Sequence, residues 1–246
     1  MKRLVMSATY RQSSRVTPES LAKDPTNRLY ARGPRFRLDA ETLRDQALFV
    51  GGLLIETVGG PSVKPPQPSG LWEAVAYTDS NTAHFTADTG NEKIHRRSFY
   101  TFWKRTSPPP QMTTLDAPSR ESCQVRRERT NTPLQALLMM NEPQFIEAAR
   151  ALAERTLREG GTAAEDRLKY MFRLVTARSP DAKDAAELTS ALKDLTAHYA
   201  KEPEAAKQLI AAGETKPDPR FRPAELAAWT MIGNVILNLD EVITKG

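Results

Sequence analysis

The residues best suited to chemistry in this sequence are arginines that come just before a predicted helix. Four arginines and two glutamates lie within residues 120–129, ahead of Asn131: Arg120, Glu121, Arg126, Arg127, Glu128 and Arg129. A guanidinium binds a carboxylate, sulfate or phosphate through two parallel hydrogen bonds. A helix start adds free backbone amides and positive potential. The segment is therefore a candidate anion-binding site.

A structural role is the alternative for these arginines, and the residue pattern favours it. Glu121 and Glu128 could pair with arginines nearby, and the remaining arginines could hold carbonyl groups of a proline-rich stretch. Such ion-pair networks resemble binding sites in sequence. Arg96 and Arg97, which open the same distinctive stretch, join the candidate ligand-binding residues.

Aromatic residues form the second candidate group. Flat rings suit the apolar faces of saccharides, yet large aromatic side chains more often form the core of a coil-rich region. We expect most of these residues to be core, with Trp72 or Trp103 the more exposed: Trp72, Phe99, Tyr100, Phe102 and Trp103.

The remaining chemistry-bearing residues give weak signals. Asp116, Glu121 and Glu128 could supply two carboxylates for glycoside hydrolysis, but sequence spacing does not give their separation in space. No catalytic residue is assigned.

Metal binding is not expected, because the histidines show no ligand spacing. His84, His95 and His198 are expected at the surface. Cys123, the single cysteine, is expected to be a partly buried apolar residue, and it excludes an internal disulfide.

A helix over residues 39–55 is the first element that must position these residues. Asp39 is a natural N-cap, and Leu43, Ala47, Val50 and Leu54 recur at helical spacing. A basic loop precedes it, with Arg28, Arg32, Arg35 and Arg37.

Residues 59–132 are rich in proline, which prevents long regular elements. Short pieces are expected within them: two helical turns over 71–77 and an aromatic strand over 98–103.

Residues 133–246 carry strong helix signals. Thr132, Pro133 and Gln135 form an N-cap, a proline at the first helical position and a reciprocal amide, so a helix should begin at Pro133. Asn141 with Gln144 repeats the cap pattern for a helix to about Glu159, and Thr162 with Glu165 for a helix to about Ala177. Further helices are expected from near Asp181, after Pro203, and from Pro223 with an apolar face.

These patterns predict a mainly α protein. It would consist of an N-terminal loop and helix over 1–58, an irregular proline- and arginine-rich region with short strands or turns over 59–132, and a helical bundle over 133–246.

Charge divides the chain of 246 residues in the same way. Residues 1–132 carry 20 Lys and Arg against 13 Asp and Glu, whereas residues 133–246 carry 15 against 17, so the basic surface belongs to the first part. Nucleic acid is a minor alternative, because no helix-turn-helix, zinc-finger or aromatic RNA-binding signature accompanies the arginines. The sequence contains no run of 18 apolar residues, so no membrane span is predicted.

The stretch RRSFYTFWKRTSPPPQMTTLDAPSRESCQVRRERTNTPLQALLMMNEPQF, residues 96–145, resembles a planctomycete family, the PSD-one domain of unknown function. The resemblance extends through SATYRQSS at 7–14, GGPSVKP at 59–65, GLWE at 70–73 and NLDE at 238–241, and so covers essentially the whole chain. Such domains lie at the C-terminal end of large exported proteins, and the chain resembles the later part of one that has lost its beginning.

The resemblance implies cytochrome-c-like and other companion domains upstream, and an extracytoplasmic or periplasmic location. Haem c is implied on those upstream domains, while this chain, without Cys-x-x-Cys-His, carries no cofactor site.

Two functional hypotheses follow. The first is an accessory domain that docks a partner domain or binds an anionic polysaccharide. The alternative is a polysaccharide-acting enzyme with its site in the central region. A cleft with two carboxylates and an exposed tryptophan would favour the enzyme, and a filled centre with internally paired arginines would favour the accessory domain.

Overall fold

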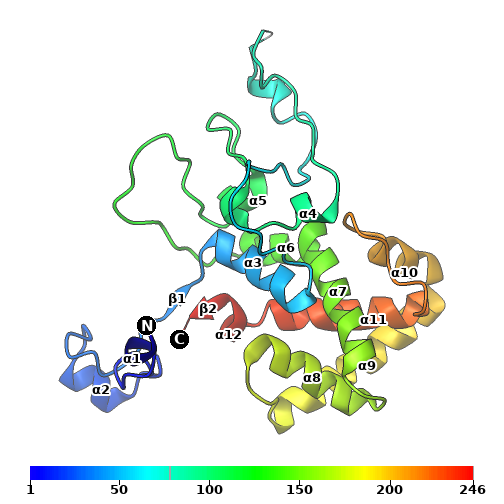
Figure 1. Cartoon of the computed structure of the whole chain (residues 1–246). Helices are drawn as coiled ribbons and strands as arrows, with labels where there is room; N and C mark the ends of the chain where they lie inside the picture. Colours follow the sequence, from blue (N-terminus) through cyan, green and yellow to red (C-terminus); the bar gives the residue numbers. More distant parts are fainter. Residues whose placement is uncertain (78, 246) are drawn as a thin grey trace.

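The computed structural model describes residues 1–77 and 79–245, and the predicted mainly α fold is confirmed (Figure 1). The helices before the bundle are α1 (Lys2–Val5), α2 (Pro18–Lys23), α3 (Ala40–Gly51), α4 (Asn91–Ile94) and α5 (Pro110–Thr114). Those of the bundle are α6 (Pro133–Asn141), α7 (Pro143–Glu159), α8 (Ala164–Thr176), α9 (Ala182–Lys201), α10 (Pro203–Ile210), α11 (Pro223–Leu237) and α12 (Asp240–Ile243). None of the helices in the described part of the chain has the length and apolarity that a membrane crossing needs.

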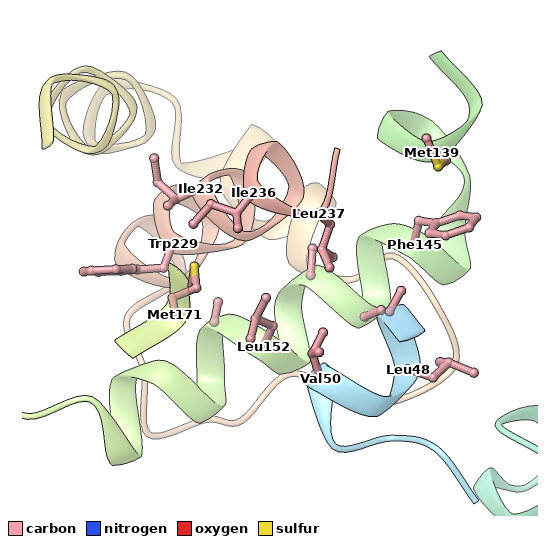
Figure 2. Close-up of a cluster of buried hydrophobic side chains, with 14 of the residues drawn as sticks. Leu48, Val50, Met139, Phe145, Leu152, Met171, Trp229, Ile232, Ile236 and Leu237 are labelled. Carbon is pink, nitrogen blue, oxygen red and sulfur yellow. The ribbon is translucent and has the colours of Figure 1, made fainter. Parts of the chain in front are cut away.

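Helix α7 is the centre of the fold, with α3 on one side and α11 on the other (Figure 2). Its alanines let both neighbours approach closely. A Cβ atom on Gly51 of α3 would lie 2.9 Å from the carbonyl oxygen of Ala148, and one on Gly233 of α11 would lie 3.1 Å from that of Ala149. Glycine is therefore needed at Gly51, where any side chain would push the helices apart, and it allows a close crossing at Gly233.

The apolar face predicted for α11 is confirmed. Leu226, Trp229, Ile232 and Ile236 are all buried, and Figure 2 shows the last three around the α7 residue Leu152. Helices α8, α9 and α10 pack around the α7 and α11 pair. Burial of each such side chain stabilises the fold by about 1.5 to 3 kcal/mol.

The observed helix starts agree best with the predicted ones where the sequence has a capping residue and a nearby proline. Thr132 and Gln135 form the reciprocal cap of α6, and Asp181 caps α9. The prediction that Asn141 caps α7 is wrong, because the cap is Glu142, whose ψ of 131° is the extended conformation that a following proline imposes. The predicted Thr162 cap is also wrong, since α8 begins after Ala163 without a side-chain cap.

The helix predicted over 39–55 ends four residues early. Gly52, at φ 76°, follows α3 in the left-handed conformation that commonly terminates helices.

The short elements predicted in the central region differ from those observed. Residues 71–77 contain only a single 3-10 turn, Glu73–Val75, and the predicted strand over 98–103 is wrong. Ser98–Tyr100 form a 3-10 turn because the backbone amide and hydroxyl of Ser98 both donate to Asp45 on α3. Only Thr101 makes a bridge, to Val63.

Residues 1–35 form an N-terminal arm beside the bundle (Figure 1). Neither α1 nor α2 has a buried residue. The arm leads into β1 (Phe36–Arg37), which pairs antiparallel with β2 (Thr244–Lys245) near the other end of the chain.

Candidate functional site

Three of the four arginines predicted within residues 120–129 to bind an anion already have carboxylate partners within the chain. Nη1 and Nη2 of Arg127 donate to the two carboxylate oxygens of Glu41 over 2.7 and 3.1 Å, and Nε of Arg129 donates to Asp39 over 3.3 Å. Arg120 lies 3.9 Å from Glu41. The hydrogen bond to Glu41 raises the pKa of Arg127.

These partners differ from the expected ones. Asp39 and Glu41 stand at the start of α3, nearly ninety positions away, whereas Glu121 and Glu128 form no ion pair with any described residue. The Asp39 carboxylate therefore pairs with arginine and does not accept a hydrogen bond from the first-turn amides of α3. Arg126 and Asn131 remain exposed.

Both ends of the loop that carries these arginines are fixed at one buried arginine. Arg37 donates to the carbonyl oxygens of Thr130 and Leu115 over 2.6 and 3.0 Å and to Asp116 over 2.6 Å. Burial would raise the pKa of Asp116, but hydrogen bonds from Thr130 and Arg37 outweigh it and lower that pKa. Asp116 is thus a structural residue, which removes one of the carboxylates considered for glycoside hydrolysis.

Arg96 is buried, and its guanidinium hydrogen-bonds to the backbone of residues 57–61. It donates to the carbonyl oxygens of Pro61, Thr57 and Gly59, and its guanidinium lies 3.7 Å from the ring centroid of Tyr100. Arg97 is partly exposed, 3.9 Å from Glu56. Arg96 therefore has the structural role considered for the arginines, which is to bind carbonyl groups of the proline-rich stretch.

Trp72 lies in the core, and the most exposed of the five aromatic residues is Phe99 at 78%, so the expectation that Trp72 or Trp103 would be the more exposed is wrong. Trp72 is 2% exposed and packs against Phe85 and Phe102, with ring centroids 5.2 and 5.6 Å away. Trp103 is half-buried, donates from Nε1 to the carbonyl oxygen of Ser119 over 2.8 Å, and has the Arg120 guanidinium 4.4 Å from its ring. The two tryptophans do not form an open stacking platform.

Two other expectations are corrected. His95 is buried rather than at the surface, and Cys123 is exposed rather than partly buried. The described residues contain no group of three His, Cys, Asp or Glu side chains that could hold a metal ion.

The exposed side of α6 is the surface feature that the sequence did not reveal. Leu134 and Leu137 are 62% and 59% exposed, and Met140 also faces solvent, all spaced by three residues along one side of the helix. We call these three residues the α6 face. The opposite side of the helix is fixed, because Gln135 donates to the carbonyl oxygen of Thr114 over 3.0 Å and Met139 is buried.

No charged residue occurs in α6, which is unusual for an exposed helix. The arginine-bearing loop leads directly into it, and Figure 1 shows that loop projecting from the body between α5 and α6. Exposed apolar side chains beside polar or charged residues are typical of interaction sites. Spacing alone could not identify the face, since the same leucines would suit a core.

Comparison with family models matches residues 1–192 to PSD1, described as "Protein of unknown function (DUF1553)". Searches of curated proteins and of solved structures find no match.

Proposed function

The chain belongs to the PSD1 family, and from this premise we propose that it is an accessory domain that docks a companion domain of a larger protein. The observation that carries the proposal is the uncharged, exposed α6 face. Docking would remove the leucines from water, which is worth about 1.5 to 3 kcal/mol for each fully buried side chain.

The chemistry of the surface supports one kind of partner. The α6 face is apolar, and the loop before it bears the exposed Arg126, which forms no ion pair with any described residue. A complementary partner has an apolar contact with acidic residues at its edge. We propose a cytochrome-c-like companion domain, in a cell-envelope location, as the family resemblance implies.

The arginine contacts support docking better than binding of an anionic polysaccharide. A sulfate or carboxylate ligand would have to displace Glu41 from Arg127 and Asp39 from Arg129. The alternative enzyme in the central region has less support, because Asp116 is held by Arg37 and Thr130.

Biolayer interferometry with a recombinant cytochrome-c-like domain from a longer member of the family tests the proposal. The Leu134→Asp/Leu137→Asp variant should bind at least about tenfold more weakly than the parent chain. The matched control is Leu4→Asp/Leu29→Asp, which changes two similarly exposed leucines on the arm and should bind like the parent. No binding by the parent, or equal loss in both variants, would contradict docking at α6.

A further inference from the structure

We propose that the chain also binds an uncharged, hydroxyl-rich ligand, such as a sugar ring, in a cavity between the proline-rich central segment and the start of α7. The cavity has a volume of about 440 Å³. That lies within the range of small-molecule sites. Leu138, one turn after Leu134 on α6, lines it, but none of the three residues of the α6 face does, so the cavity and the docking surface consist of different residues.

Polar side chains without protein partners line this cavity. Gln111 on α5 is 7% exposed, and its amide forms no hydrogen bond with any described residue. Gln67 also lines the cavity, and its buried Nε2 has no partner in the described structure. The Gln111 amide is therefore free to bond with a ligand, whereas the buried Nε2 of Gln67 would reach a ligand only after its side chain shifts.

The same wall contains groups that would accept from ligand hydroxyls. Glu142 lines the cavity and caps α7, with one carboxylate oxygen, Oε2, accepting from the amides of Gln144 and Phe145. Its other oxygen, Oε1, accepts from no described residue. The Thr114 hydroxyl also lines the cavity and forms no hydrogen bond with the described residues. Amides, a hydroxyl and a carboxylate together can serve as both donors and acceptors, as a polyhydroxyl ring requires.

The charges around the cavity favour an uncharged ligand. No lysine or arginine lines it, so an anion would find no cation to pair with. The buried carboxylate of Glu147 is already balanced from behind by Arg150, whose Nη2 lies 3.8 Å from its Oε1. Burial raises the pKa of Glu142, and the nearby Arg44 guanidinium partly balances its charge. Glu214 stands exposed at the rim, where water screens its charge.

Most of the remaining lining is apolar carbon. Four prolines and a leucine line the cavity: Pro66, Pro68, Pro110, Pro143 and Leu138. Such surfaces can cover the C–H faces of a ring while a few polar groups fix its orientation.

Saturation-transfer NMR on the whole chain tests the inference, with glucose, galactose, mannose and N-acetylglucosamine as neutral probes and with glucosamine and glucuronate as charged ones. At least one neutral sugar should bind at millimolar concentration, and its charged counterparts should bind about tenfold more weakly or not at all. Gln111→Leu and Thr114→Val should each weaken binding by about tenfold, because each removes a hydrogen bond to the ligand.

Gln208→Leu is the matched control, because it makes the same change at an exposed position on α10 and should leave binding unchanged. Thermal unfolding identifies any variant that fails to fold. Leu134→Asp/Leu137→Asp should still bind sugar, which separates this inference from the docking proposal. Absence of binding by every neutral sugar, equal binding of the charged sugars, or unchanged affinity in both folded cavity variants would overturn it.

Discussion

Nε2 of His95 lies 3.5 Å from Oε2 of Glu147, and these side chains are only 3% and 1% exposed. Glu147 also accepts from the backbone amide of Thr215 over 2.7 Å. Burial alone would raise the pKa of Glu147, but the contacts with His95 and Thr215 outweigh it and hold that pKa at about 2. One ionised carboxylate on α7 thus joins the end of α4 to the connection between α10 and α11.

The free energy of unfolding should depend on pH because of the Glu147 carboxylate. Its folded pKa of about 2 lies below the ordinary 4.5, so its contribution is complete above pH 4.5 and is lost as the pH falls towards 2. Glu147→Gln should lower the free energy of unfolding at pH 7 by about 3 kcal/mol, and the difference from the parent should shrink below pH 4.5. Urea unfolding measures both values. A difference that is constant between pH 7 and pH 2.5 would contradict the assignment, and exposed Glu204→Gln should show none at any pH.

Arg44 should be among the most sensitive positions in the chain. It is buried on α3 and donates to the carbonyl oxygens of Ile94 and Arg96 over 2.6 and 3.0 Å and to Gln144 over 2.7 Å. Arg44→Met leaves these acceptors unpaired and should lower the free energy of unfolding by about 3 to 5 kcal/mol. Exposed Arg126→Met should change it by no more than about 0.5 kcal/mol in the same denaturation assay. Similar effects of both changes would show that Arg44 does not connect these elements.

Two neighbouring glycines should respond to alanine for different reasons. Gly51→Ala places a Cβ atom 2.9 Å from the carbonyl oxygen of Ala148 and should destabilise the fold by about 1 to 3 kcal/mol through separation of α3 and α7. Gly52→Ala meets nothing within 4 Å, but φ is 76°, so it should cost about 1 to 2 kcal/mol of backbone strain. Asparagine tolerates this conformation, so Gly52→Asn should recover much of the loss in thermal unfolding. Equal stability of Gly52→Asn and Gly52→Ala would argue against strain.

Loss of the Arg37 anchor should free the arginine-bearing loop. Arg37→Ala removes the donor shared by Leu115, Asp116 and Thr130, so backbone amides in residues 117–132 should exchange with deuterium at least about tenfold faster. Exchange in α7 should change less. Surface Arg97→Ala is the control and should leave the loop unchanged. Uniformly faster exchange throughout the chain would instead indicate general destabilisation.

Local signals in the sequence were enough to predict where several bundle helices begin. The Thr132 and Gln135 cap, the helix start near Asp181 and the proline at 223 are signals within a few residues of the helix start, so spacing alone predicts them. Where two local signals compete, the prediction failed. Asn141 looks like a cap, yet Pro143 constrains the residue directly before it, which makes Glu142 the cap.

The candidate sites depend on long-range partners that spacing does not contain. Arg127 meets Glu41 across 86 positions, and His95 meets Glu147 only after α4 packs near α7. The cavity arises in the same way, because Gln67 and Gln111 come together with Glu142 only in the folded chain. The sequence did identify a proline-rich region without long regular elements, but not which of its side chains would remain without a partner.

The pairing of β1 with β2 determines how the domain can be joined to others. Phe36 is in register with Lys245, so the arm and the C-terminal end of the chain leave the bundle at neighbouring points (Figure 1). Short linkers at these two points would suffice to insert the bundle into an exposed loop of a second protein. A bundle inserted in this way would be held at one end, and its opposite end, near α9 and α10, would point away from the host.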